Sequence, residues 1–421
     1  MTTEASRDEV SGSKRVLLTG GRAPAALELA RLLAAGGHEV YMAESCPEQL
    51  CRQAKDVRRS YIVPEPAANP RAYVDALLQI VQAERIDWLV PTCEELFYVA
   101  SGLETLSIHC HVFTEPLDKL RRLHSKWEFI QLVLRLGFTA PPTYLLTSRE
   151  DGIEFMKRAE RQAASTDGAS GNGGTRWVLK PVFSRFSSKV VITEAQGKKA
   201  LSAALLDRLD ASEAVPWVAQ QYVAGQAFCS YSVAHQGRIA AHAVYPVRFT
   251  AGRGACISFE PVSHPGIDRW VERFVQAERF TGQIAFDFIV DEAGDIYPLE
   301  CNPRATSGIH LFRPEDRLDT AFFPELTEAK PPIVPQPSRK AMISVAMLVY
   351  GIFGIRSRER LKQWTQYVVQ GQDAVYRSND RKPFRQQFRL LYWNWRKGVR
   401  RRISIMEAST HDIEWNGGEL K

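Results

Sequence analysis

The stretch Gln283–Arg304 reads QIAFDFIVDEAGDIYPLECNPR, and it decides the fold. Two runs with alternating apolar residues, AFDFIV and DIYPLECN, flank the turn DEAG, a pattern typical of a β-hairpin. Pairing the two strands across this turn predicts that Asp287 faces Pro298 and that Glu300 is the diagonal neighbour of Asp287. A β-bulge would shift this register.

Three oxygen-bearing side chains gather on one face of this hairpin. Glu300 and Asn302 are two residues apart on a strand and share a face, whereas Cys301 points away. Together with Asp287 they offer two carboxylates and an amide, which suit a hard cation such as Mg²⁺ when substrate phosphates complete its coordination. Arg304 adds a guanidinium beside this predicted metal site, where it would stabilise a transferring phosphoryl group. The competing interpretation is a solvent-facing polar hairpin.

Two lysines upstream have a matching chemistry. Lys180 lies in VLKP at the end of an apolar strand, where an isolated ammonium is costly unless it meets an anion. Lys126 lies in HSKWEF and opens a helix expected over Ser125–Leu136. Each lysine alone is more often a surface residue, but their order relative to the acidic hairpin favours phosphate binding.

That order of motifs resembles the ATP-grasp superfamily. The motifs are Lys126 at a helix start, VLKP at 178–181, a serine-rich turn at 184–188, AQQYVAG at 219–225, and Asp287 followed by ExNPR at 300–304. The nearer relatives would be the carbamoyl phosphate synthetase large subunit, biotin carboxylase and amino-acid ligases. The resemblance covers roughly residues 15–312, and the five motifs in this order are far more specific than any one of them.

The resemblance implies a role for each matching residue. Lys126, Lys180 and the serine-rich turn would contact the ATP phosphates, the segment after the hinge strand would contact adenine, the acidic hairpin would hold Mg²⁺, or Mn²⁺ in its place, and Arg304 with Lys180 would act on the γ-phosphate. The implied nucleotide-binding residues are Lys126, Lys180, Ser187, Ser188, Gln220, Gln221, Tyr222 and Val223, and the implied metal ligands are Asp287, Glu300 and Asn302. The sequence departs from the family's pattern in two places, since the phosphate-covering turn is poor in glycine and Ala227 stands where a carboxylate usually meets the ribose.

The chain is expected to combine α/β and α+β architecture in three parts. Alternating apolar strands and helices predict a Rossmann-like pre-ATP-grasp domain with a parallel sheet over residues 1–116. A two-lobed ATP-grasp domain is expected over 117–330, and a basic, helical C-terminal extension over 331–421. The turn Thr19–Pro24 lacks the GxGxxG spacing of nicotinamide-binding folds. The glycine- and serine-rich stretch Ala163–Thr175 predicts a surface loop.

Composition indicates an ordinary globular protein. Of 421 residues, 45% are hydrophobic and 24% charged, which excludes wholesale disorder. Seven scattered cysteines without a CxxC pair argue against a disulfide framework or zinc ribbon, so we expect a cytoplasmic protein. The N-terminus has no secretory signal pattern. The longest apolar run, Ala341–Ile355, is shorter than the roughly 20 residues of a spanning helix and is expected to be a buried strand or helix.

Positive charge is concentrated at the C-terminal end. Residues 336–421 contain 17 Lys and Arg against 7 Asp and Glu, a net charge of +10, and the remainder contains 37 against 41, or −4. Residues 381–402 predict an amphipathic helix whose apolar stripe, Phe384, Phe388, Leu391 and Trp395, packs on its own domain. Contact with a membrane, nucleic acid or an acidic partner is the lesser alternative. The closing DIEWNG, residues 412–417, could fold back over a site.

The predicted function is an ATP-dependent, ADP-forming ligase. The resemblance implies that a carboxylate is phosphorylated to an acyl phosphate and that an amine then takes the acyl group, with small-molecule substrates from specialised metabolism. Arg248, His310, Glu94 and Glu95 are candidates for the acceptor side, although each also has an ordinary structural explanation. The alternative is a non-catalytic nucleotide-binding protein whose basic tail engages a macromolecule.

Overall fold

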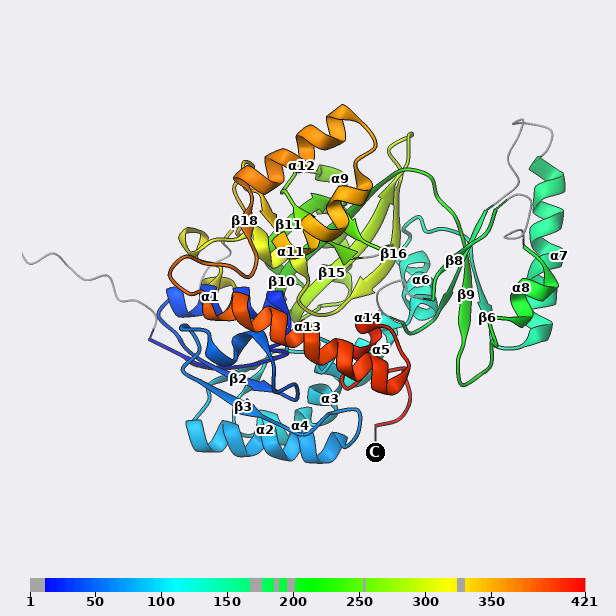
Figure 1. Ribbon diagram of the computed structural model, residues 1–421. Helices are drawn as coiled ribbons and strands as arrows, with labels where there is room; N and C mark the ends of the chain where they lie inside the picture. Colours follow the sequence, from blue (N-terminus) through cyan, green and yellow to red (C-terminus); the bar gives the residue numbers. More distant parts are fainter. Residues whose placement is uncertain are drawn as a thin grey trace, which may run out of the picture.

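The computed structural model describes residues 12–166, 176–184, 189–194, 201–252, 255–323 and 330–420. Figure 1 shows a parallel sheet with its helices at the N-terminal end, a central antiparallel sheet, and a smaller sheet that carries α7 and α8 at the far side. The predicted combination of α/β and α+β architecture is therefore confirmed.

The N-terminal sheet is parallel, with strand order β3-β2-β1-β4-β5. The strands are β1 (Arg15–Thr19), β2 (Glu39–Glu44), β3 (Arg59–Ile62), β4 (Trp88–Val90) and β5 (His111–Val112). The helices are α1 (Pro24–Ala35), η1 (Leu50–Gln53), α2 (Pro70–Glu84), α3 (Leu96–Ser101) and α4 (Leu103–Ser107). Sequence analysis did not find β3, because its four residues RSYI are half-buried or exposed and contain no apolar run.

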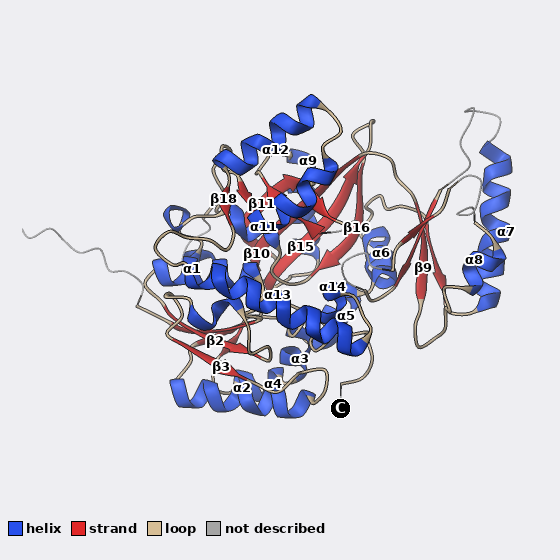
Figure 2. Cartoon of the chain, in the orientation of Figure 1, coloured by secondary structure: helices blue, strands red, loops and turns tan. Residues whose placement is uncertain are grey.

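Two helices lead from this sheet into a small antiparallel sheet. They are α5 (Leu117–His124) and α6 (Lys126–Arg135), and α6 confirms the helix expected from Ser125 onward. The small sheet has the order β6-β9-β7-β8, with β6 (Thr143–Leu146), β7 (Trp177–Pro181), β8 (Val191–Ile192), β9 (Trp217–Gln221), α7 (Arg149–Thr166) and α8 (Ala203–Asp207). Figure 2 shows its two helices beside its strands.

The loop expected over Ala163–Thr175 is wrong in its first part. Helix α7 continues to Thr166, because alanines at 163 and 164 favour helix. Residues 167–175 lie outside the described ranges.

The central sheet contains the hairpin on which the site depends. Its order is β11-β10-β15-β16, and its strands are β10 (Gln226–His235), β11 (Arg238–Pro246), β15 (Gly282–Val290) and β16 (Ile296–Asn302), with α9 (Pro265–Ala277) packed on one face. The predicted register is wrong at the site. Asp287 pairs with Glu300 while Phe288 pairs with Pro298, so Leu299 is an extra residue in a β-bulge. The bulge places the two carboxylates directly opposite each other.

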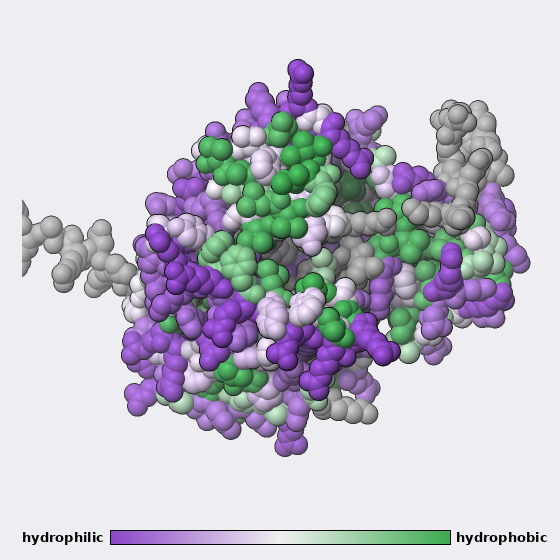
Figure 3. Space-filling model, in the orientation of Figure 1, coloured by the Kyte–Doolittle hydropathy of each residue, from purple (hydrophilic) through white to green (hydrophobic). Residues whose placement is uncertain are grey.

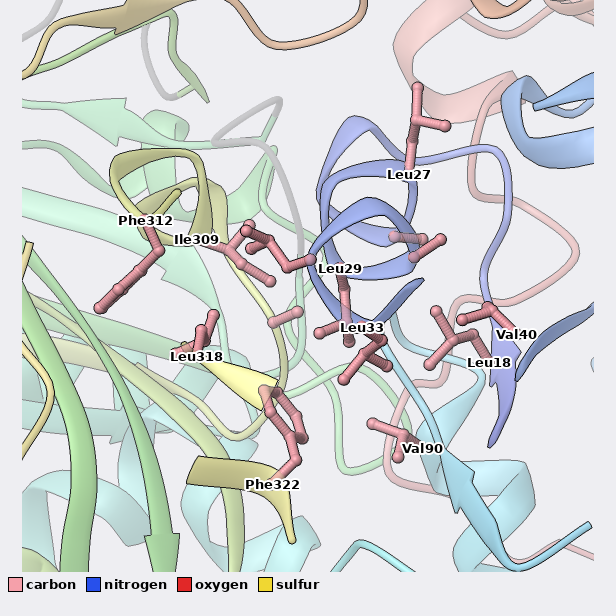
Figure 4. Close-up of a cluster of buried hydrophobic side chains, with 14 of the residues drawn as sticks. Leu18, Leu27, Leu29, Leu33, Val40, Val90, Ile309, Phe312, Leu318 and Phe322 are labelled. Atoms are coloured by element: carbon pink, nitrogen blue, oxygen red, sulfur yellow. The ribbon is translucent and has the colours of Figure 1, made fainter. Parts of the chain in front are cut away.

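A continuous apolar core ties α1 to the central part of the molecule. Figure 4 shows Leu29 and Leu33 of α1 between Leu18 and Val40 of the N-terminal sheet and a second group from residues 309–322. That second group comes from the short helices η2 (Ser307–Leu311), η3 (Pro314–Asp316) and α10 (Asp319–Phe322). Burying these side chains fixes the end of the hairpin relative to the N-terminal sheet.

The C-terminal part returns to both sheets. It contains β17 (Ala341–Met342), α11 (Ser344–Ala346), η4 (Met347–Gly351), η5 (Ile352–Gly354), α12 (Arg358–Gln370), β18 (Gln372–Asp373), α13 (Lys382–Arg401) and α14 (Ile405–Ala408). The short strands β12 (Thr250–Ala251) and β13 (Ala255–Cys256) pair with each other, and β14 (Ser258–Phe259) pairs with β17. Within the described ranges, none of the helices combines the length and apolar content needed to span a bilayer.

Two expectations about this part are wrong. The run Ala341–Ile355 starts buried but then exposes large side chains, with Phe353 80% exposed. Helix α13 forms and packs on the rest of the protein as predicted, but of the predicted stripe Phe384 packs against the core while Phe388 is 51% and Trp395 49% exposed. The helix also packs through Gln386, Leu390, Asn394 and Gly398. Hydrophobic periodicity identified the stripe, whereas tertiary packing selected another face of the helix.

Candidate active site

One cavity of about 730 Å³ is lined by the predicted residues that the structure describes. It lies between the small sheet and the central sheet and also touches the N-terminal turn and the C-terminal part. Its lining includes Lys126, Lys180, Gln220, Gln221, Tyr222, Val223, Asp287, Glu300, Asn302 and Arg304. Ser187 and Ser188 lie outside the described residues.

The acidic hairpin forms the most strongly charged part of the cavity. Asp287 and Glu300 are cross-strand partners, and Asn302 Nδ2 donates to Glu300 Oε1 at 3.5 Å. Cys301 points to the opposite, buried side. Burial and the neighbouring charge of Glu300 raise the pKa of Asp287. Burial acts in the same direction on the pKa of Glu300, but Lys126 and Lys180 lower it overall. Two half-buried carboxylates that are direct cross-strand partners are a favourable place for a divalent cation.

The ammonium groups of two buried lysines lie close to the acidic hairpin. Lys126 Nζ donates to the carbonyl of Ser184 at 3.0 Å and lies 3.6 Å from Glu300 Oε2. Lys180 Nζ donates to Gln220 Oε1 at 3.0 Å and to the carbonyl of Leu299, the bulge residue, at 3.2 Å. Burial lowers the pKa of Lys180 to about 8. Because Lys126 starts α6, where the helix dipole disfavours a cation, an anion bound there would relieve an unfavourable arrangement.

The predicted adenine segment, residues 220–223, begins in the last two residues of β9 and continues beyond it. The backbone amide of Tyr222 donates to the carbonyl of Arg176, whose guanidinium lies 4.0 Å from the centre of the Tyr222 ring. Gln220 is buried, and its Nε2 donates to Thr143 Oγ1 while its Oε1 accepts from Lys180. Gln220 therefore positions Lys180. Val178, Ile192, Phe288 and Ile289 form the apolar wall of the same region, and Ala227 lines it without a carboxylate.

Arg304 is fixed at the end of the hairpin. Its Nη2 donates to Asn302 Oδ1 at 3.0 Å and lies 3.6 Å from Glu94 Oε1, and its Nη1 donates to the carbonyl of Ala305. The guanidinium is thus held beside the acidic pair and faces the cavity.

Of the four candidate residues for the acceptor side, two lie at or near the cavity and two have structural partners. His310 lines the cavity. Glu94 lies 3.6 Å from the guanidinium of Arg304, which also lines the cavity. Glu95 is structural, because its Oε1 accepts from Thr19 Oγ1 and from the amides of Thr92 and Cys93. Arg248 lies outside this cavity and pairs with Glu260 at 3.3 Å.

Apart from the closing segment 412–417, the contribution of the C-terminal part to this cavity was not predicted from the sequence. Leu390, Asn394, Ser409, Thr410 and Ile413 form part of its wall. They are held there by Asp412, which accepts from Arg22 Nη1 at 2.8 Å and from Lys397 Nζ at 2.9 Å.

Arg22 in turn binds Glu44 at the end of β2 and faces the cavity from the turn after β1. The closing segment therefore does fold back, with Trp415 packed against Phe97 and Phe183. The only sequence signal was the acidic and aromatic DIEWN itself.

Solved structures share this architecture, although no family model and no curated protein matches the sequence. An L-amino acid ligase from Bacillus licheniformis has a TM-score of 0.56 at 14% identity over 78% of each chain. N5-carboxyaminoimidazole synthetase from Staphylococcus aureus, solved with ADP, has a TM-score of 0.56 at 13% identity over 78% of this chain and 80% of its own.

The biotin carboxylase domain of the Hydrogenobacter thermophilus 2-oxoglutarate carboxylase, solved with MgADP and bicarbonate, has a TM-score of 0.56 at 13% identity over 76% of this chain and 72% of its own. At such low identity these likenesses establish the fold, which is the ATP-grasp fold that the motifs predicted.

Proposed function

We propose that the protein is an ATP-dependent, ADP-forming ligase that joins a small-molecule carboxylate to an amine. The observation that carries this proposal is the direct pairing of Asp287 with Glu300 across the hairpin, in a cavity that three cations also line. Lys126 lies 3.6 Å from Glu300, Lys180 donates to the carbonyl of Leu299, and Arg304 donates to Asn302. Such a set of fixed charges suits phosphoryl transfer, which depends on positioning and charge stabilisation rather than on a side-chain nucleophile.

The donor set fits Mg²⁺. Asp287, Glu300 and Asn302 would hold it, since all three offer oxygen ligands and the two carboxylates are half-buried and directly paired across the hairpin. When bound, the ion supplies charge neutralisation for the ATP phosphates. Asn302 has a second function, because its amide oxygen accepts from Arg304 and so couples the position of the guanidinium to the acidic pair.

In the first step, a carboxylate oxygen of the substrate attacks the γ-phosphorus of ATP. The bond from the γ-phosphorus to the bridging oxygen breaks, ADP leaves, and an acyl phosphate forms. Lys126 and Lys180 would bind the phosphate oxygens, and Arg304 would stabilise the charge that develops on the transferring group. Hydrogen bonds hold all three cations in place before any substrate arrives, so little reorganisation is needed.

In the second step, an amine attacks the carbonyl carbon of the acyl phosphate. Phosphate departs with the electrons of the carbon–oxygen bond, the nitrogen loses a proton, and an amide remains. Water must be kept out, because it would hydrolyse the acyl phosphate. The C-terminal wall would contribute to this exclusion through Leu390 and Ile413. Specialised metabolism in a reducing cytoplasm is the setting we propose.

The experiment that tests this function is ADP release by the purified protein with Mg²⁺ and ATP, across pools of carboxylates and amines. We expect release that depends on one carboxylate, formation of an amide, and at least a hundredfold loss of rate in Glu300→Gln. Glu292→Gln is the matched control, because Glu292 is an exposed carboxylate on the turn of the same hairpin. If ATP binds but no pool supports turnover, the protein is a nucleotide-binding protein without ligase activity.

A further inference from the structure

Helix α13 presents two different faces. Its inner face, with Gln386, Leu390, Asn394 and Gly398, packs on the protein and lines the cavity through Leu390 and Asn394. Gln386 Nε2 donates to Glu48 Oε2 at 2.7 Å, and Lys397 Nζ donates to Asp412 Oδ1 at 2.9 Å, so the helix is tied to other parts of the protein near both of its ends. The helix is therefore anchored, and its outer face has a fixed orientation.

The outer face carries a continuous apolar stripe. Its residues recur at spacings of three and four, which places them on one side of the helix over several turns. Phe388 is 51%, Tyr392 59% and Val399 63% exposed. The ring centres of Tyr392 and Trp395 lie 5.7 Å apart. We call this stripe the outer stripe, and its members are Phe388, Leu391, Tyr392, Trp395 and Val399.

A row of arginines runs beside the outer stripe. The helix contains seven Lys and Arg residues and no Asp or Glu. Helical geometry puts Arg385, Arg389, Arg396 and Arg400 next to the stripe on one side. The Arg396 guanidinium lies 5.9 Å from the Tyr392 ring centre. An exposed apolar stripe with a basic border is typical of a helix that lies in the interface of an anionic membrane.

A second exposed apolar segment lies near this helix. Leu348, Val349, Tyr350 and Ile352 are each about half-exposed, and Phe353 is 80% exposed. This segment directly follows α11, and α11 and α13 line the same cavity through Ala346 and Leu390. Figure 3 shows apolar surface gathered over α11, α12 and α13 on one side of the molecule. The two segments thus offer apolar groups on a common face.

We propose that the outer stripe of α13 and the segment Leu348–Phe353 dock the protein on an anionic phospholipid surface. Aromatic rings and aliphatic groups would enter the interface while the arginines meet lipid phosphates. A second copy of this chain is disfavoured, because two rows of arginines would face each other. Nucleic acid is disfavoured as the partner of the whole face, because the segment Leu348–Phe353 contains no Lys or Arg that could meet a phosphate backbone.

Docking in this way has a consequence for the cavity. The inner face of α13 lines the cavity and the outer face would lie on the lipid, so only the thickness of one helix, about 10 Å, separates the two. The proposal stands whether or not the protein is a ligase.

The test is flotation of the full-length protein with vesicles of phosphatidylcholine alone and of phosphatidylcholine with about one quarter phosphatidylglycerol. We expect flotation with the anionic vesicles only, weakening as salt is raised. The double variant Phe388→Ala with Trp395→Ala should reduce the bound fraction about tenfold or more. Ile108→Ala is the matched control, because Ile108 is a 77% exposed apolar residue at the end of α4. Circular dichroism and the ADP-release rate without vesicles should be the same in all three proteins.

Three results would overturn the proposal. The first is no flotation with anionic vesicles, and the second is flotation that the double variant retains. The third is a different occupant of the same face: either single-stranded oligonucleotide that binds the wild type tightly and the double variant weakly, or a dimer in light scattering that the double variant abolishes.

Discussion

Glu300 lies next to several of the other functional groups of this site. It lies opposite Asp287, accepts from Asn302 and lies within 3.6 Å of Lys126. The bulge at Leu299 makes this arrangement possible, and it leaves the Leu299 carbonyl available to accept from Lys180. Sequence analysis predicted that the carboxylates converge but not the register, because a bulge has no clear signature in an alternating pattern.

Gly20 is a residue at which the backbone itself excludes a side chain. It has φ of +76° in the turn after β1, and a Cβ there would lie 2.6 Å from Thr92 Oγ1 and 2.9 Å from Glu95 Oε1. We expect Gly20→Ala to lower the free energy of unfolding by roughly 2–4 kcal/mol. Chemical denaturation followed by circular dichroism would measure this.

Gly37 provides the matched control for this effect. Its φ is +90°, but a Cβ there meets nothing within 4 Å. Gly37→Ala should therefore cost about 1 kcal/mol from backbone strain alone. Equal losses in the two variants would mean that the contacts with Thr92 and Glu95 relax without cost.

At the level of secondary-structure elements, periodic segments were correctly predicted to form helices, but the helix face that packs against the rest of the protein was not predicted. The helix expected over Ser125–Leu136 matches α6, because the Ser125 side chain caps it by accepting from the amide of Glu128. The amphipathic pattern of α13 predicted a helix but not the face that packs. The inner face contains Gln386 and Asn394, which no hydrophobic scale would select, and Gln386 is buried because its Nε2 donates to Glu48.

Substitutions on the two faces of α13 should have different effects on the steady-state kinetics. Leu390 lines the cavity, whereas its neighbour Leu391 is 42% exposed on the outer stripe. If the protein is the proposed ligase, Leu390→Ala should raise the KM for the carboxylate or amine several-fold and leave the KM for ATP nearly unchanged. Leu391→Ala should change neither in the absence of vesicles. A rise in the KM for ATP alone would place Leu390 against the nucleotide instead.

At the scale of the whole molecule, the cavity depends on segments from both ends of the chain. The motifs around Lys126, Lys180, Gln220 and the acidic hairpin all line the cavity, and they were recognisable because each combines a charged or polar residue with a strand or helix end. The opposite wall was not predictable, because Arg22 and Asp412 lie far apart in the sequence and neither belongs to a repeating pattern. Only the folded chain shows that Asp412 holds this wall in place.

The Asp412 contacts predict a pH-dependent stability. Burial acts to raise the pKa of Asp412, but Arg22 and Lys397 lower it well below the usual value of about 3.9. A carboxylate whose pKa is lower in the folded than in the unfolded state stabilises the protein above the unfolded pKa, and this stabilisation is lost as the pH falls. We expect Asp412→Asn to lower the free energy of unfolding by roughly 3 kcal/mol near pH 7, with the difference from wild type shrinking below about pH 4.

Urea unfolding at a series of pH values would measure this difference. Asp295→Asn is the control, because Asp295 is an exposed carboxylate on the hairpin turn and should change stability little at any pH. A difference between wild type and Asp412→Asn that stays constant down to about pH 3 would assign the effect to packing rather than to charge.

The contact between Arg22 and Asp412 also constrains the order in which the protein folds during translation. The two residues are 390 positions apart, and a ribosome adds about 5 to 20 residues per second, so Arg22 is synthesised roughly 20 to 80 s before its partner. During this interval the first sheet can form, with Glu44 beside Arg22. The wall made by Ser409, Thr410 and Ile413 does not yet exist. The cavity can therefore be complete only after residue 413 has been synthesised.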